Sequence, residues 1–339
     1  MSQLSCISRS TGLYLVLRLC IAGLLLVQWG CAWHETNETS ARADGAAPNW
    51  REGSIIETAT GEAISLDQLT FRLLQQEVVY LGEEHHNKFH VETALTLLQR
   101  LMTQARKPVL AMEMFGWDGQ PAINRFLTGP ELGRQDFLEQ ALWQRNWGGA
   151  FEDYEPLVQY TRVHHLSLIA LNPPKPLVRA VAKLGLEQAR QGPEMAQWGM
   201  QHEAIVDDQA YRSRLLGQLR ACHDGGADAM YQTMYEASMV RDEGMARTVA
   251  REVERLRSMG DPHAGPVVSY TGGGHVQYHL PVPKRVARRL SDPVSQLTIY
   301  MASFDPERIN EIREMIQEKI ADFVWLTPVG TQGSPRRCR

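Results

Sequence analysis

The residues best suited to chemistry in this sequence gather in two glycine–histidine motifs. Gly82-Glu-Glu-His85 and Gly272-Gly-Gly-His275 each follow a short apolar run, and Glu113 follows a third such run. Imidazoles and carboxylates can hold a divalent metal, activate its bound water or bind a cofactor. Each motif alone has a simpler interpretation, since acidic residues can be solvated and a triple glycine can be a tight turn. Their combination favours a genuine site.

A divalent metal is one interpretation of this pattern, with Zn, Mn or Co as suitable ions. The ligands that the motifs would supply are His85, His275, Glu83 and Glu113. His86 and His90 stand four positions apart, which can place two imidazoles on one helix face, although surface histidines also show this spacing. A nucleotide site is disfavoured because the triple glycine lacks the lysine and the Ser or Thr of a Walker loop. A covalent hydrolase is disfavoured too, since no Ser or Cys has an identifiable base.

The strands that must position these residues are short apolar runs without clean alternation. This pattern is typical of parallel strands that are covered on both faces. The predicted strands are 78–81, 109–112, 168–171, 267–270 and 297–301. Four of them end in polar or glycine-rich residues, and ligands bind outside the carboxyl ends of the strands in open α/β sheets. The sequence therefore predicts a site at that edge.

Helical periodicity separates the strands. Val91, Leu95, Leu98 and Met102 follow a helix spacing, and an Asp305-Pro306 cap precedes a stripe of isoleucines from 309 to 320. This alternation predicts an α/β fold with three α/β/α layers and a largely parallel sheet. Two longer segments, about 117–162 and 176–259, are mostly helical in pattern and predict a smaller helical subdomain.

The N-terminus predicts export. Arg9 and Arg18 precede an apolar run over 19–27 that is too short to span a bilayer, so residues 1–30 are predicted to be a signal peptide. Gly30-Cys31 resembles a lipobox, which predicts lipidation of Cys31, although Gln28 stands where leucine is usual. An uncleaved anchor, or a secretory signal with an incidental cysteine, is the alternative.

The remaining chain divides by composition. Residues 31–50 predict a lipidated N-terminus and flexible linker, 51–326 a folded α/β domain, and 327–339 a flexible tail. Cys222 and Cys338 would remain as thiols. A net charge of −4 over 339 residues favours neither a nucleic-acid partner nor a polybasic membrane surface.

Several short motifs together carry a family resemblance over about residues 50–290. They are 79–85 with His90, Ala111-Met-Glu-Met-Phe115, Tyr154-Glu-Pro-Leu157, Ala170-Leu-Asn172 before Leu177-Val-Arg-Ala180, Arg241-Asp242 before Met245-Ala246, and Gly274-His275 before Val282-Pro283. The chain resembles the ChaN-like haem-binding uptake lipoproteins, within a superfamily that includes Tiki-type metalloproteases and erythromycin-esterase-like hydrolases. The resemblance implies a bacterial envelope lipoprotein, anchored by lipid in the outer membrane and facing the periplasm or the surface. It also implies haem binding in iron acquisition.

The resemblance further implies a homodimer around stacked haems, with tyrosine on the iron and histidine of the partner subunit near a propionate. The candidate cofactor-binding residues are His85, His275, Glu83, Glu113, His90, Tyr154, Tyr231, Tyr235 and Tyr270. Each tyrosine could instead belong to a core. Lys175, Arg179 and Arg241 could pair with propionates or be surface charges. A metal-dependent hydrolase using the histidine and glutamate set remains the alternative to a non-enzymatic haem-binding protein.

Overall fold

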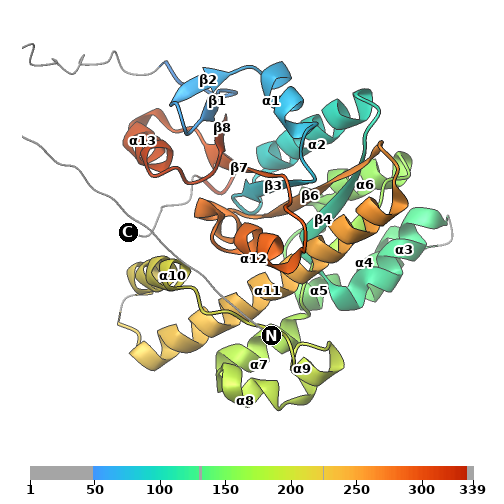
Figure 1. Cartoon of the computed structure of the whole chain (residues 1–339), viewed down its shortest axis with the longest axis vertical. Coiled ribbons are helices and arrows are strands. Elements are labelled where there is room, and N and C mark those ends of the chain that lie inside the picture. Colours follow the sequence, from blue (N-terminus) through green and yellow to red (C-terminus); the bar gives the residue numbers. More distant parts are fainter. Residues whose placement is uncertain (1–48, 130–131, 224, 334–339) are drawn as a thin grey trace, which may run out of the picture. The chain divides into compact units, whose positions relative to one another are not determined.

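Eight strands form one mixed sheet in the computed structural model, which describes residues 49–129, 132–223 and 225–333 (Figure 1). The strand order is β2-β1-β8-β7-β3-β6-β4-β5. The strands are β1 (Ile55–Glu57), β2 (Glu62–Ile64), β3 (Val78–Glu83), β4 (Lys107–Gly116), β5 (Leu168–Asn172), β6 (Ala264–Gly272), β7 (Gln296–Ser303) and β8 (Phe323–Thr327). β1 is antiparallel to β2 and β8, and the other neighbouring strands are parallel.

The helices lie between these strands along the chain. They are α1 (Leu66–Leu73), α2 (Lys88–Thr103), α3 (Gln120–Thr128), α4 (Arg134–Gln140), α5 (Trp143–Asn146), α6 (Glu155–Val163), α7 (Lys175–Leu184), α8 (Leu186–Arg190), α9 (Pro193–Gln197), α10 (Gln209–Cys222), α11 (Asp228–Met259), α12 (Val282–Arg289) and α13 (Ile309–Gln317). Short 3-10 turns add η1 (Trp117–Gly119), η2 (Phe151–Asp153), η3 (Gly273–His275), η4 (Gln277–His279) and η5 (Pro306–Arg308).

Successive side chains of β3 enter different cores, because side chains alternate across a strand. Val79 and Leu81 pack with α1, α2 and α6 on one face of the sheet. Val78 and Tyr80 pack with α11 and α12 on the other. Both faces are therefore covered by helices, and the predicted α/β fold with a largely parallel sheet is confirmed.

The predicted strands all form, with longer bounds. Three strands were not predicted: β1 and β2, which have three residues each, and β8, whose last residue, Thr327, is the first of the predicted tail. The Asp305 cap is confirmed, since its side chain accepts a hydrogen bond from the Glu307 amide at 3.0 Å. The helix after it begins as the 3-10 turn η5 and ends as α13, and Ile320 is buried just beyond.

The two predicted helical segments pack in different places. Helices α3 to α6 contribute their aromatic side chains to the same core as α2 and the sheet. Helices α7 to α10 and the first half of α11 form two smaller clusters, whereas the second half of α11 packs on the sheet. The 32-residue helix α11 thus connects the helical region to the sheet (Figure 1).

The predicted signal peptide, Cys31 and most of the predicted linker lie outside the described residues, as does the end of the predicted tail. Within the described ranges, no helix has the length and apolar character needed to cross a membrane. Cys222 is disulfide-bonded, so the prediction of a free thiol there is wrong. The other cysteines of the chain fall outside the described residues.

Candidate functional site

Neighbouring parallel strands carry the two histidine motifs to one edge of the sheet. β3 and β6 pair from Val78 with Val267 to Glu83 with Gly272. The helix after β3, α2, covers one face of the sheet, and the helix after β6, α12, covers the other. This divergence marks the usual place of ligands in α/β sheets. We call the residues at these strand ends, 83–85 and 272–275, the carboxyl edge.

At this edge a buried carboxylate holds His85. The imidazole Nδ1 lies 2.7 Å from Oε1 of Glu83, and Glu83 also accepts hydrogen bonds from the hydroxyls of Tyr154 and Tyr270, at 3.1 and 2.6 Å. The His85 ring packs edge-on against Trp147, with 4.9 Å between centroids. Because Nδ1 is engaged and the side chain is 42% exposed, Nε2 is the nitrogen that can reach a ligand.

His275 is held in the same manner by a second carboxylate. Its Nδ1 lies 2.5 Å from Oδ1 of Asp242, and the hydroxyl of Tyr211 donates to Oδ2 of Asp242 at 2.5 Å. The Arg285 guanidinium lies over the Tyr211 ring, 4.6 Å from its centroid. Contacts from α12, α10 and α11 therefore converge on the orientation of the His275 ring.

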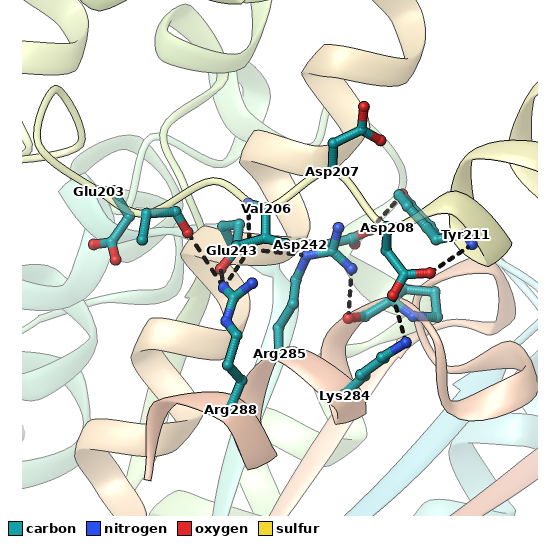
Figure 2. A network of polar contacts seen from close by, with 12 residues as sticks. Glu203, Val206, Asp207, Asp208, Tyr211, Asp242, Glu243, Lys284, Arg285 and Arg288 are labelled. Carbon is teal, nitrogen blue, oxygen red and sulfur yellow. Dashed lines mark hydrogen bonds and ion pairs between the residues drawn. The ribbon is translucent and has the colours of Figure 1, made fainter.

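Figure 2 shows the polar network around this support, with cations of α12 pointing toward acids of α11 and of the loop before α10. Glu243, which follows Asp242, is fully buried and forms ion pairs with three arginines. These arginines are Arg285, Arg288 and Arg289. Lys284 pairs with Asp208, the N-cap of α10. The network holds α10 and α12 in place around Asp242, the residue that supports His275.

Glu113 joins the two histidine motifs. Its Oε2 accepts hydrogen bonds from the Gly272 amide at 2.6 Å and the Thr271 hydroxyl at 2.5 Å, and its Oε1 pairs with Arg241. Nε2 of His275 lies 3.5 Å from the same Oε1. Arg241 also donates through Nε to Asn172 at 3.0 Å, so the last residue of β5 joins the network.

The charges of this cluster shift its pKa values. Burial lowers the pKa of His85, but its hydrogen bond to Glu83 and the charge of Glu113 outweigh burial and raise it. Burial likewise opposes the charges of Glu113 and Asp242, which together raise the pKa of His275 to about 9. Burial raises the pKa of Glu113, but Arg241 and His275 hold it well below its ordinary value. His275 is therefore an imidazolium at neutral pH, next to an ionised Glu113.

His86 and His90 do not share a helix face, so that prediction from their spacing is wrong. α2 begins at residue 88, after His86, which has a left-handed φ of 65° and pairs with Asp153 at 2.6 Å. His90 is fully buried, and its Nδ1 accepts a hydrogen bond from the Glu84 amide at 2.9 Å. Burial lowers the pKa of His90 to about 3, so its imidazole is neutral at physiological pH.

Two of the candidate tyrosines lie at the carboxyl edge, as donors to Glu83. Burial and the negative charge of Glu83 raise the pKa of both Tyr154 and Tyr270. A phenolate, the form that binds ferric haem, is thereby disfavoured at both positions. The geometry gives these tyrosines a role in orienting Glu83 and, through it, His85.

The other two candidate tyrosines lie on α11, in the helical region. Tyr235 donates to Asp207 at 2.6 Å, and Tyr231 donates to the carbonyl of His223. Burial and the bond to Asp207 raise the pKa of Tyr235. Both side chains are buried, and the structure does not bring them to the carboxyl edge by any hydrogen bond among the described residues. An iron-binding role for either tyrosine therefore stays a prediction.

The carboxylates of the proposed metal set are already occupied. Glu83 receives two hydroxyls and one imidazole, and Glu113 receives an amide, a hydroxyl and a guanidinium. Within the described residues, no group of three or more His, Cys, Asp or Glu side chains is arranged to hold a metal ion. The arrangement presents imidazoles, with the carboxylates as their supports.

Two further cations, Lys175 and Arg179, lie near Arg241, which pairs with Glu113. Burial and the charges of Arg179 and Arg241 lower the pKa of Lys175, at the start of α7. Arg179 is exposed one turn later. The indole N–H of Trp147, beside His85, is buried without a hydrogen-bond partner in the part of the chain that the structure describes. The edge thus combines a buried indole N–H, the positive charge of Arg241 and its neighbours, and two imidazoles.

Sequence reasoning missed several residues of this site. In the sequence Asp242 stands out only as part of a short motif, and no pattern marks Trp147. The ring of Tyr300, within β7, packs over Gly273, where an added Cβ would stand 2.5 Å from Cε2 of the ring. Thr271 completes the contacts of Glu113. Only Asp242 carried a signal, through its place in the Arg241-Asp242 motif.

Comparisons with known proteins identify a family for this chain. A family model described as haem-binding uptake, Tiki superfamily, ChaN matches residues 69–286, which include both histidine motifs. Among curated proteins, the chain is 25% identical over 268 residues to protein RETICULATA-RELATED 5, chloroplastic, of Arabidopsis thaliana. That match covers 75% of this chain and 34% of the relative, so the chain spans about a third of the relative's length.

Among solved structures, the fold is similar to ChaN of Campylobacter jejuni, described as showing cofacial haem binding. The TM-score is 0.60 at 14% identity, over 80% of this chain and 95% of that chain, so the likeness shows the fold alone. The erythromycin esterase EreC matches with a TM-score of 0.42 at 14% identity, over 74% of this chain and 76% of that chain. A likeness at that level supports no argument about this chain.

Proposed function

This chain belongs to the ChaN family of haem-binding uptake proteins in the Tiki superfamily, and we propose that it binds haem at its carboxyl edge. The observation that carries the proposal is the pair of imidazoles, His85 and His275, which come from neighbouring strands and are each held through Nδ1 by a buried carboxylate. The matched family region contains both motifs and their supports. Haem would be bound without a covalent step.

The donor set suits an iron porphyrin. Haem iron accepts imidazole or phenolate ligands, and carboxylates that hold Nδ1 set the orientation and basicity of Nε2. His85 is the more accessible imidazole, with 42% of its side chain exposed against 15% for His275. His85 is therefore the better candidate to face the iron, and the imidazolium of His275 the better candidate to face a propionate.

The cations at the edge suit the two propionates of haem. Arg241 is 30% exposed and is held by Glu113 and Asn172, while Lys175 and Arg179 extend the positive charge onto α7. Carboxylates pair strongly with fixed guanidinium groups. A neutral porphyrin without propionates would leave these cations without an anionic partner. A porphyrin that carries two carboxylates therefore fits the edge better.

The cellular role follows from the family and the N-terminal sequence. We propose that the protein is a lipoprotein, anchored through Cys31 in the bacterial envelope, that takes up haem for iron acquisition. A homodimer around stacked haems is part of the same proposal. It is supported by the fold likeness to a ChaN structure that shows cofacial haem binding.

Titration of the purified chain with ferric haem tests this function. We expect a Soret band that saturates at a fixed haem-to-protein ratio, with micromolar or tighter binding. His85→Ala should weaken binding or change the band, whereas the control His263→Ala, at an exposed histidine near the opposite ends of the strands, should leave both unchanged. No saturable Soret change with the unmodified chain would refute haem binding.

A further inference from the structure

A cavity of about 450 Å³ lies apart from the histidine network, between α11, the end of α9 and the edge strand β5. Its walls include the indoles of Trp117 and Trp198 and the guanidinium groups of Arg247, Arg251 and Arg255. The volume is within the range of small-molecule sites. None of its described lining residues belongs to the hydrogen-bond network of His85 and His275.

The aromatic walls of this cavity are held in place by hydrogen bonds. The Trp117 indole donates to the Thr248 hydroxyl at 2.9 Å and to the Leu171 carbonyl at 3.2 Å. Arg247 donates to the Trp198 carbonyl at 3.1 Å, and its guanidinium lies 4.4 Å from the centroid of a Trp117 ring. The two indoles are 6.1 Å apart at 55°. The Trp117 indole is therefore fixed, with Arg247 against its ring, and the backbone of Trp198 is tied to the same arginine.

The positive charge of the cavity is not balanced by its own acids. Arg247, Arg251 and Arg255 recur every four residues along α11, so like charges share one helix face and repel one another. Arg247 pairs with Glu203 at 3.6 Å, and Arg255 pairs with the neighbouring Glu252. Over the described ranges of the chain, no carboxylate pairs with Arg251, which is exposed. An anion beside Arg251 would relieve this repulsion.

We propose that this cavity binds a planar aromatic carboxylate, with its ring against Trp117 and Trp198 and its carboxylate on Arg251. Indoles favour flat apolar rings, and a guanidinium favours a carboxylate through two parallel hydrogen bonds. A neutral ring would leave the charge of Arg251 unbalanced, and an aliphatic acid would leave the indoles uncovered. The inference does not depend on haem binding at the carboxyl edge.

Calorimetry with naphthalene-2-carboxylate and the full-length chain tests the proposal. Arg251→Gln should weaken this probe about tenfold or more, because it removes a charge-assisted hydrogen bond. The matched control is Arg220→Gln, at an exposed arginine of α10 outside the cavity, which should bind as the unmodified chain does. Naphthalene-2-carboxamide should bind at least about tenfold more weakly and should not respond to Arg251→Gln. Both substituted positions are exposed, so folding should be retained.

Two results would overturn the assignment: no binding of the naphthoate to the unmodified chain, or equal binding by the Arg251→Gln and Arg220→Gln variants. Haem itself is a planar ring with carboxylates. Competition between haem and the naphthoate therefore distinguishes haem from a smaller aromatic acid as the occupant of the cavity. Displacement of the probe by one equivalent of haem would identify haem as an occupant of this cavity. Simultaneous binding would identify a smaller aromatic acid. Either outcome supports the aromatic carboxylate site, and a Soret titration reports haem binding at the carboxyl edge separately.

Discussion

The imidazole of His85 lies against Gly272, so closely that a Cβ atom on Gly272 would stand 2.7 Å from Cε1 of the ring. Gly272 has an ordinary φ of −56°, so alanine there meets no backbone strain. Gly272→Ala should therefore displace the His85 ring from Glu83, at a cost of about 1 to 3 kcal/mol in unfolding free energy. NMR titration should show the pKa of His85 moving toward its ordinary value.

Gly274→Ala is the matched control for that substitution, since nothing lies within 4 Å of a Cβ at this position. It should leave the unfolding free energy and the titration of His85 unchanged. If the two alanine variants behave alike, the close contact of His85 with Gly272 does not position the imidazole.

The raised pKa of His275 predicts a dependence of stability on pH in the haem-free protein. Its pKa of about 9 in the folded state lies above the unfolded value of 6.5. The resulting stabilisation is fully present below about pH 6.5 and is lost as the pH rises through 9, with an upper bound of about 3 kcal/mol. Urea unfolding between pH 6 and pH 10 measures it. Asp242→Asn removes one of the two charges responsible and should flatten the profile, so an equally steep profile in that variant would contradict this origin.

Substitution of Glu243 tests how much the polar network beneath the site stabilises the folded protein. It is buried and pairs with three arginines, of which Arg285 and Arg288 are drawn in Figure 2. Arg289 also pairs with Glu203, but removal of Glu243 leaves Arg285 and Arg288 without a carboxylate partner among the described residues. Glu243→Gln should lower the unfolding free energy by about 3 kcal/mol or more. Asp228→Asn, which breaks the exposed pair with Arg220, should cost less than about 1 kcal/mol. Equal losses in chemical denaturation would show that the buried network contributes no more than a surface pair.

The carboxyl edge was predictable because its strands are apolar runs that end in acidic, glycine and histidine residues. Glu83 and Glu113 each follow such a run by one or two residues, and parallel strands bring their ends together. The two strands that carry the histidines are direct neighbours, which the sequence order did not require. β1 and β2 could not be found in the same manner, since three residues are too few to show a period.

The supports of the histidines were not predictable, because they depend on tertiary contacts. Asp242 stands in the middle of a 32-residue helix, and no local spacing relates it to His275. His86 adopts a left-handed φ, which turns its side chain toward Asp153 instead of along α2. The hydrogen-bond partner of the Tyr154 and Tyr270 hydroxyls likewise depends on tertiary contacts. Both tyrosines were candidate iron ligands from the sequence, and in the structure both donate to Glu83.

Membrane anchoring through Cys31 is tested by fractionation. If the cysteine is diacylated, Cys31→Ser should move the protein from the detergent-extracted membrane to the soluble envelope fraction, since two acyl chains suffice for stable anchoring. Mass spectrometry of the mature N-terminus provides the second measurement. Unchanged fractionation together with an N-terminus that carries no lipid mass would refute the lipoprotein proposal and leave haem binding untouched.

The comparison of tyrosine with histidine variants tests the ligand itself. Single Phe substitutions at Tyr154, Tyr270, Tyr231 and Tyr235 remove only a hydroxyl, so packing is largely kept. If one tyrosine binds the iron, that variant alone should change the visible spectrum of the haem complex. Tyr154→Phe and Tyr270→Phe should in addition lower the unfolding free energy by about 1 kcal/mol, because each removes a hydrogen bond to the buried Glu83.

His85→Ala and His275→Ala complete that comparison. If tyrosine is the iron ligand, these variants should act mainly on haem affinity or dimer formation. If His85 is the ligand, its loss should change the Soret band while all four tyrosine variants keep it. A metal-dependent hydrolase would show a third pattern, in which the histidine variants lose bound metal and activity and no variant alters a chromophore. Absorbance spectra, metal analysis and sedimentation of the same six proteins separate the three, because each pattern follows from the group that contacts the bound ion.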